Sequence, residues 1–317
     1  MFYLYIFLFI TLVVGILTLI ILKIEEPSIP INFESINTIN NLPKFPYNET
    51  QTFEIINNNI DNVVKNSKIA IVSLSIGKRD FAKISKNRLE TYTELHGYSL
   101  EYFDKVLDDK YEIMWQKVIA VIQTLNKKEN GEYKYDAVFW IDDDAYITNT
   151  SYPLEVFMNL TDKDIILSRD CPMDDINVYI NSGTYIIKNT ETGRNFMNDL
   201  INNYNIYKGY FQKKLFHEQS VMIYLYLTKY INQCEILPFN ILQSHNNYGG
   251  VWKKIAGKGQ TSEFHRGWKY KDFIIHLAGV KKDNRSKIMN KLTLRDDFLI
   301  IKDKKYPVTS KSWNIYG

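Results

Sequence analysis

The stretch Tyr135-Asp-Ala-Val-Phe-Trp-Ile-Asp-Asp-Asp144 decides the fold of this 317-residue chain, because it joins a continuous apolar run directly to three carboxylates. An apolar run of this length is typical of a strand that is buried on both faces of a parallel sheet. Side chains alternate along a strand, so Asp142 and Asp144 can share one side while Asp143 points away. We therefore predict a buried strand over 135–141 that ends in two neighbouring carboxylates.

Short strands and helices alternate before this run. β-branched residues predict a strand over 68–74, and a helical pattern over 81–96 ends at Gly97, a residue typical of helix C-termini. A strand over 99–103 and a helix with one apolar face over 113–125 follow. This alternation favours βαβ units and therefore an α/β protein with an open sheet covered by helices. Such sheets bind ligands outside the carboxyl ends of their strands, where the aspartates lie.

The composition limits the classes of protein to consider. Hydrophobic residues make up 45% of the chain, so it can build a large core and is not disordered as a whole. The formal net charge is only +3, whereas proteins that bind nucleic acids usually carry a marked basic excess, so we expect no nucleic-acid partner. Two cysteines, Cys171 and Cys234, cannot form a disulfide scaffold or a four-thiolate zinc site.

The first segment of the chain differs from the rest. Residues 1–22 carry no charged side chain, and a helix of this length is long enough to cross a bilayer. We expect a transmembrane anchor over 1–23, with a cleaved signal peptide as the alternative. Charged residues follow the segment, which weakly favours a cytosolic N-terminus and a single-pass type II membrane protein. Residues 24–66 lack a helical or strand period and are expected to form an extended stem.

The paired carboxylates predict a cation site. Two carboxylates on one side of a strand repel each other unless a cation lies between them, and such oxygen ligands favour Mg²⁺ or Mn²⁺ shared with substrate phosphates. An acidic turn that only caps the next helix is the alternative. His276 ends a second apolar strand and could be a third ligand, or a structural histidine. Gly279 would let the backbone approach a diphosphate, and the lysines that follow it could neutralise that group.

Two polar clusters lie between these motifs in the sequence. Asn181 and Gln219 could hydrogen-bond sugar hydroxyls, and Glu218 could orient an acceptor. A turn residue and a carboxylate on a helix N-terminus are the ordinary alternatives.

Together these motifs resemble glycosyltransferase family 34. The resemblance covers about Lys68 to Arg285 and depends on seven motifs in order: Asn87-Arg-Leu-Glu-Thr-Tyr92, His96-Gly-Tyr98, Trp115-Gln-Lys117, Phe139-Trp-Ile-Asp-Asp-Asp-Ala-Tyr-Ile-Thr148, Asn181-Ser-Gly183, Glu218-Gln-Ser220 and His276-Leu-Ala-Gly-Val-Lys281. The resemblance implies a GT-A catalytic domain over 67–317, an open mixed sheet flanked by helices. It also implies retaining transfer of a hexosyl or pentosyl unit from a UDP- or GDP-sugar to a glycan or glycoprotein.

The resemblance further implies a role for each motif. The metal would be Mn²⁺, or Mg²⁺, and its ligands would be Asp142, Asp144 and His276. The donor site would add these residues: Asp143, Lys281, Lys117, Gly279 and Ser75. The catalytic candidates would be Gln219, near the anomeric centre, with Glu218 and Asn181. A protein of this family would reside in the Golgi or another secretory-pathway membrane, with its catalytic domain in the lumen.

The loop over 244–270 could complete the acceptor site. It contains Tyr248, Trp252 and Trp268, whose rings could stack on sugar faces, or could simply anchor a surface loop. Two other functions remain open at this point: a catalytically inactive relative that binds glycans, and a metal-dependent enzyme of phosphate esters such as a nucleotidyltransferase or nuclease.

Overall fold

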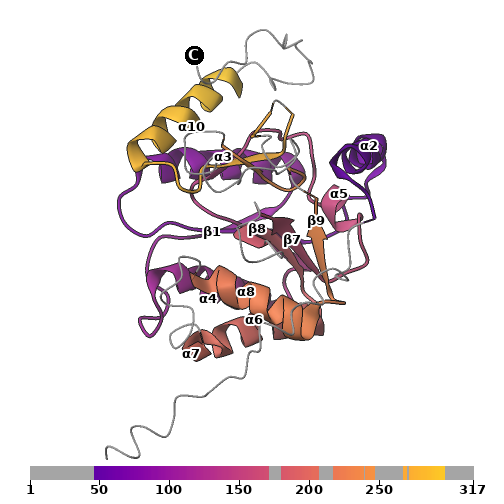
Figure 1. Ribbon diagram of the computed structural model, residues 1–317, viewed down its shortest axis with the longest axis vertical. Coiled ribbons are helices and arrows are strands. Elements are labelled where there is room, and N and C mark those ends of the chain that lie inside the picture. The colour runs from indigo at the N-terminus through magenta and orange to yellow at the C-terminus, as the bar shows by residue number, and fades with distance from the viewer. Residues whose placement is uncertain are drawn as a thin grey trace, which may run out of the picture. The chain divides into compact units, whose positions relative to one another are not determined.

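The computed structural model of the chain describes residues 46–170, 180–206, 217–238, 240–246, 267–269 and 271–296 (Figure 1). The anchor expected over 1–23 lies outside these ranges, as do Cys171, Tyr248 and Trp252. Within them, none of the helices has the length and apolar character needed to cross a bilayer.

A six-stranded mixed sheet forms the centre of the folded unit. Its strand order is β2-β1-β5-β8-β7-β9. The first three strands in this order are parallel, β8 is antiparallel to both of its neighbours, and β9 is parallel to β7. The strands are β1 (Ile69–Leu74), β2 (Ser99–Phe103), β5 (Ala137–Ile141), β7 (Ile165–Arg169), β8 (Ile180–Lys188) and β9 (Cys234–Leu237). The expected mixed α/β sheet is therefore confirmed.

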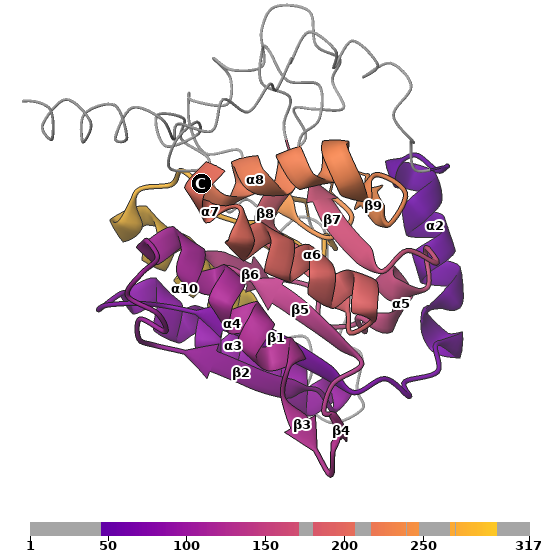
Figure 2. The same ribbon diagram turned by 90° about the horizontal axis from the view of Figure 1, so that it is seen from below.

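Helices cover both faces of this sheet (Figures 1 and 2). One face carries α4 (Gln116–Leu125), α6 (Glu191–Asn202) and α8 (His217–Leu225), and the other carries α3 (Asp80–His96) and α10 (Lys282–Asp296). The alternation of side chains along each strand separates the two cores. Val138 and Trp140 of β5 pack on the side of α4, whereas Phe139 packs in the core that contains Leu89 of α3.

A second sheet has three strands, the first of which follows β5 in the chain. It consists of β6 (Ala145–Ile147), β10 (Ser244–His245) and β11 (Ile274–His276), in the order β10-β11-β6. The antiparallel register of β11 and β6 sets His276 opposite Ala145. Because the aspartate triplet is the turn between β5 and β6, this register brings the histidine beside it.

The remaining elements are short. They are α2 (Glu49–Asn59), the 3₁₀ turns Ile60–Asn62 and Ile113–Trp115, the hairpin β3 (Lys128–Glu129) and β4 (Glu132–Tyr133), α5 (Glu155–Met158), α7 (Tyr204–Ile206) and the π-helical turn Tyr226–Tyr230. The helix expected over 113–125 thus begins as a 3₁₀ turn. Every other helix and strand predicted for 68–141 is present to within two residues of its expected ends.

The stem expected over 24–66 is in part a packed helix, which corrects that prediction for α2. Asn48 and Gln51 form a capping box that begins the helix, because each side chain accepts a hydrogen bond from the other residue's backbone N–H. Ile56 is 1% exposed and joins the core that contains Val156 of α5.

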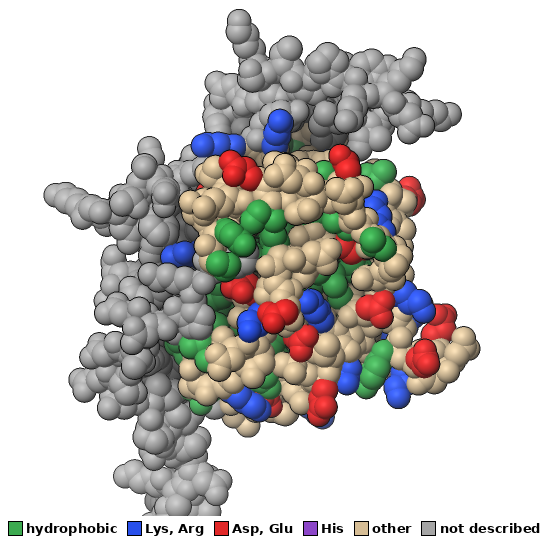
Figure 3. All heavy atoms as spheres, turned by 90° about the vertical axis from the view of Figure 1, so that its right-hand side faces the viewer, with side chains coloured by type: hydrophobic (Ala, Val, Ile, Leu, Met, Phe, Trp, Pro, Cys, Tyr) green, Lys and Arg blue, Asp and Glu red, His purple; other side chains and the backbone are tan. Residues whose placement is uncertain are grey.

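Figure 3 views the side of the molecule that lies on the right of Figure 1, where acidic and basic side chains are interspersed.

Candidate metal centre

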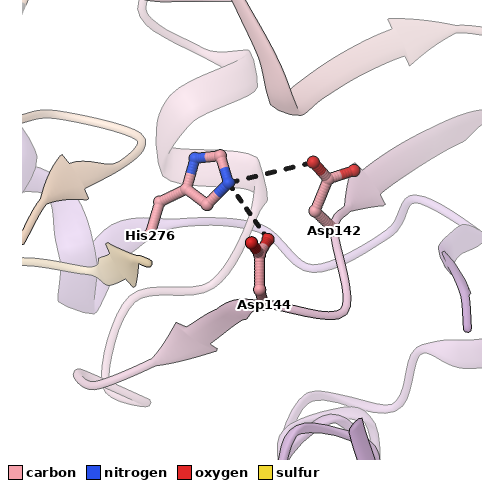
Figure 4. Close-up of side chains that lie close together, drawn as sticks. All are labelled: Asp142, Asp144 and His276. Atoms are coloured by element: carbon pink, nitrogen blue, oxygen red, sulfur yellow. Dashed lines mark ion pairs between the residues drawn. The ribbon is translucent and has the colours of Figure 1, made fainter. Parts of the chain in front are cut away.

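The turn between β5 and β6 holds Asp142 and Asp144 against His276. The backbone N–H of Asp142 donates to the carbonyl of Gly183 at 2.8 Å, and the carbonyl of Asp144 accepts from Leu277 at 3.0 Å. Nε2 of His276 lies 3.2 Å from Oδ1 of Asp144 and 3.8 Å from Oδ2 of Asp142. Figure 4 shows this one ring nitrogen facing both carboxylates. One ligand atom from each residue lies within 4.8 Å of the others.

The charges at this centre are strongly perturbed by burial. Burial raises the pKa of Asp142 above its ordinary value in spite of the nearby ammonium of Lys117. Burial also opposes ionisation of Asp144, but the imidazole of His276 and the guanidinium of Arg285 hold the pKa of Asp144 below its ordinary value. The pKa of His276 is raised, because attraction to Asp144 outweighs the effect of burial. A divalent cation bound between the two buried carboxylates would relieve the repulsion between their like charges.

The donor set fits the metal implied by the family resemblance. Two carboxylate oxygens and one imidazole nitrogen converge here, and such mixed oxygen and nitrogen ligands suit divalent metal ions, among them Mn²⁺. The three residues predicted as metal ligands are thus brought together. Asp143 instead turns to Arg79, whose Nη1 lies 3.0 Å from Oδ2 of Asp143, so it is separated from its two neighbours as expected. The expected cause differs, because the three aspartates form a turn after β5 and do not continue the strand.

Because Gly183 has no side chain, there is room beside it for the ring of His276. A Cβ atom on Gly183 would lie 2.2 Å from Cε1 of His276 and 2.8 Å from Oδ1 of Asn181. The motif Asn181-Ser-Gly183 therefore contributes to the site through its lack of a side chain at the third position, as well as through its polar groups.

We expect Gly183→Ala to weaken Mn²⁺ binding by about tenfold or more, because the added methyl group displaces the imidazole ligand. Titration of the purified chain with Mn²⁺, followed by the electron paramagnetic resonance of the free ion, measures this. Gly193→Ala is the matched control, since its Cβ would lie at a similarly short distance, 2.1 Å, from the carbonyl oxygen of Lys188, away from the metal centre. The control should lose stability but keep its Mn²⁺ affinity, and equal losses of affinity in both variants would contradict the assignment.

Lys117 links the metal centre to the predicted catalytic residue Glu218. Nζ of Lys117 lies 2.9 Å from Oδ1 of Asp142 and 2.9 Å from Oε1 of Glu218. Burial disfavours the charge of Lys117, but the two carboxylates hold its pKa above the ordinary value. Glu218 is 2% exposed and also accepts from the hydroxyl of Ser182 at 2.8 Å. The structure therefore places Glu218 as a buried counter-ion of Lys117.

The other predicted catalytic residues, Gln219 of α8 and Asn181 of β8, both hydrogen-bond to the start of β8. Oε1 of Gln219 accepts from the backbone N–H of Ser182 at 3.0 Å. Nδ2 of Asn181 donates to Oδ2 of Asp170 at 3.0 Å, and its Oδ1 accepts from the N–H of Gly183. Both amides thus bond to the segment Asn181–Gly183, and Gly183 of this segment lies against His276 of the metal centre.

The residues predicted to bind the donor differ in their exposure to solvent. Asp143 and Ser75 are both buried, at 7% and 6% exposure, and burial raises the pKa of Asp143 to about 6. Gly279 has a φ of +73°, a conformation that favours glycine, in the turn before α10. Lys281 is exposed immediately before α10, and its carbonyl accepts from the N–H of Arg285.

Trp268 is placed in the core instead of on a sugar-binding surface. It is 7% exposed, packs in the cluster that contains Phe81, and its indole N–H donates to Oγ1 of Thr148 at 2.8 Å. This is the anchoring role considered as the alternative for this loop.

Several site residues were missed by reasoning from the sequence. Arg285 pairs with Oδ2 of Asp144 at 3.0 Å, and its only sequence signal is its position one helical turn after Lys281. Nε2 of His245 lies 3.1 Å from Oδ1 of Asp170, and the His245 ring stacks on His276 with centroids 5.7 Å apart. The parallel register of β10 and β11 sets the two histidines side by side.

This combination of a mixed sheet, an Asp-x-Asp turn after β5 and a histidine beside that turn resembles the GT-A glycosyltransferases. Residues 64–180 match the model of the galactosyl transferase GMA12/MNN10 family, glycosyltransferase family 34, which confirms the resemblance predicted from the sequence over the first four of its seven motifs. No curated protein sequence shows significant similarity to the chain.

One solved glycosyltransferase structure is similar in fold, and two others match at lower TM-scores. A glycosyltransferase involved in the glycosylation of the major capsid of PBCV-1 has 17% identity and a TM-score of 0.53, over 71% of this chain and 99% of that chain. The glycosyltransferase GlyE of Streptococcus pneumoniae TIGR4 has 15% identity and a TM-score of 0.46, over 72% of this chain and 61% of that chain. The galactosyltransferase LgtC has 12% identity and a TM-score of 0.44, over 74% of this chain and 98% of that chain. The family match and the fold together support a glycosyltransferase that uses a nucleotide-sugar donor.

Proposed function

We propose that this chain is a metal-dependent, retaining glycosyltransferase that moves a hexosyl or pentosyl unit from a UDP- or GDP-sugar to a glycan hydroxyl. The observation that supports metal dependence is the convergence of Asp142, Asp144 and His276 at the carboxyl end of β5. That edge is where open α/β sheets bind their ligands. Mn²⁺ bound there would act as a Lewis acid on the diphosphate leaving group.

The residues of the chain would hold the donor and stabilise the leaving group. Lys281, exposed before α10, would neutralise the diphosphate as it departs with the bonding electrons of the sugar C1–O bond. Asn181 and Gln219, on β8 and α8, would hydrogen-bond the sugar. The acceptor hydroxyl would attack from the face that the diphosphate leaves, which gives retention, and a phosphate oxygen of the donor would accept its proton. Glu218 is paired with Lys117, so in this proposal it orders the site and is not the base.

The test is an assay of the full-length chain with a panel of UDP- and GDP-sugars and Mn²⁺. We expect donor hydrolysis or transfer with one sugar, and a fall in turnover of about a hundredfold or more when EDTA removes the metal. Restoration by added Mn²⁺ is the control, and the anomeric configuration of the product by nuclear magnetic resonance tests retention.

Each alternative function predicts a different result in this assay. A donor that binds without turnover would identify an inactive glycan-binding relative. Cleavage of a phosphodiester without a sugar acceptor would identify a phosphate-ester enzyme instead. Full turnover in EDTA would contradict the proposed metal dependence.

A further inference from the structure

Each carboxylate of the aspartate triplet pairs with its own basic side chain. The partners come from three separate elements of the fold, at 2.9–3.0 Å: Lys117 with Asp142, Arg79 with Asp143 and Arg285 with Asp144. These cations offset the repulsion within the triplet. Asp142 and Asp144 are the two residues of the triplet that are predicted metal ligands. In each of them, one carboxylate oxygen contacts the basic side chain and the other faces His276.

Asp142 has one oxygen held by the protein and one that faces His276. Its Oδ1 accepts from the indole N–H of Trp140 at 2.8 Å and lies 2.9 Å from Nζ of Lys117. Its Oδ2 lies 3.8 Å from Nε2 of His276. A lone pair engaged by a charged donor is less available to a cation, so Asp142 presents Oδ2 to the metal site.

Asp144 repeats this division with Arg285 in the place of Lys117. Its Oδ2 lies 3.0 Å from Nη2 of Arg285, and its Oδ1 lies 3.2 Å from Nε2 of His276. Rotation of the carboxylate would break the ion pair with a side chain that is only 17% exposed. The guanidinium therefore fixes which oxygen Asp144 offers to the metal.

Arg285 is itself held by the packing of the C-terminal helix. Its guanidinium lies over the ring of Phe81, 5.3 Å from the centroid, and Ile288, Met289 and Leu292 of α10 are buried in the same cluster. The orientation of Asp144 thus depends on how α10 docks against α3.

We propose that Arg285 is a positioning residue of the metal centre, which orients Asp144 for metal binding and couples metal affinity to the docking of α10. This inference rests on the proposed metal-dependent function. Family resemblance gives Arg285 no role, because the motif His276-Leu-Ala-Gly-Val-Lys281 ends before it.

The sign of the effect separates positioning from simple charge. Loss of a positive charge beside two carboxylates would, by Coulomb attraction alone, tighten the binding of a divalent cation. Loss of a positioning contact would weaken it, since residues that orient metal ligands are commonly worth about ten- to a hundredfold in metal affinity.

The test is titration of the full-length chain with Mn²⁺ alone, followed by the electron paramagnetic resonance of the free ion. We expect Arg285→Met, which keeps an apolar stem against Phe81, to raise the Mn²⁺ dissociation constant by about tenfold or more. Arg285→Lys keeps the charge but lacks the planar guanidinium, so we expect an increase of about threefold. Arg79→Met is the matched control, because it removes the same charge from Asp143, which faces away from His276, and should change the affinity by less than about twofold.

Three results would overturn the inference and leave the proposed function intact: unchanged or tighter binding in Arg285→Met, unchanged binding in Arg285→Lys, or an equal loss in Arg79→Met. If Arg285→Met does not fold, as judged by its thermal unfolding, Arg285→Lys alone decides. A wild-type chain that binds no Mn²⁺ would overturn both the inference and the metal dependence on which it rests.

Discussion

Asp144→Asn is expected to lower Mn²⁺-dependent sugar transfer by about a hundredfold to a thousandfold, while the chain stays folded. Asparagine preserves the shape of the side chain but removes the negative charge that faces His276 at 3.2 Å. It also replaces one carboxylate oxygen by an NH₂ group, which is no ligand for a cation. Initial rates with the active donor, at saturating Mn²⁺, measure the loss.

Asp143→Asn is the matched control for this variant. Asp143 belongs to the same triplet and is equally buried, but its carboxylate turns to Arg79. We expect the control to lose about tenfold or less, because its contribution to the metal centre is indirect. Undiminished transfer by Asp144→Asn, or equal losses in the two variants, would refute the assignment of Asp144 as a metal ligand.

The separation of Asp143 from its two neighbours was predictable from the sequence because it depends on local geometry. The apolar run over 137–141 identifies β5 without knowledge of its partners. The triplet that follows forms a turn and does not continue the strand, so alternation predicted the separation of Asp143 correctly although it does not describe the backbone there. The helix α3 and its end at Gly97, which has a φ of +76°, are local in the same sense. Local patterns thus gave the strand, the turn and the orientation of its carboxylates.

The partners of those carboxylates were not predictable, because they come from distant parts of the chain. Arg79 is 64 residues before Asp143, and Arg285 reaches Asp144 only through the docking of α10. The position of His276 opposite Ala145 depends on the register of two short strands, which no periodicity determines. Family resemblance supplied His276, but it contained no signal for either arginine.

Burial explains why the structure differs from the expectations drawn from the sequence at Glu218 and at α2. A glutamate at a helix N-terminus is most often solvated, so its sequence context does not reveal that Lys117 lies 2.9 Å away. Phe53 and Ile56 of α2, with Ile60 of the 3₁₀ turn that follows, have a helical spacing, but among many asparagines the pattern is too short to stand out. The contacts of Ile56, Phe53 and Ile60 with the core show that this segment is packed.

Lys117→Met is expected to lower the free energy of unfolding by about 3–5 kcal/mol, because it leaves buried carboxylates without their cation. The Lys117 side chain is 7% exposed and lies 2.9 Å from both Asp142 and Glu218. Methionine fills a similar volume, so the loss would reflect charge and not a cavity. Urea denaturation followed by circular dichroism, in the absence of metal, measures it.

Two further variants separate a stranded charge from a general effect of removing a lysine. Lys117→Met combined with Glu218→Gln removes one of the two stranded charges, so it should regain about 1–3 kcal/mol relative to Lys117→Met alone. Lys127→Met breaks the ion pair with Glu101, but the Lys127 side chain is 40% exposed, so we expect a loss of about 1 kcal/mol or less. A double variant no more stable than Lys117→Met would show that Glu218 is not stranded by the loss of Lys117.

The activity of Glu218→Gln alone tests the role of Glu218 in the reaction. Since a neutral amide cannot replace a general base, residual transfer by this variant would support the role of Glu218 as a counter-ion.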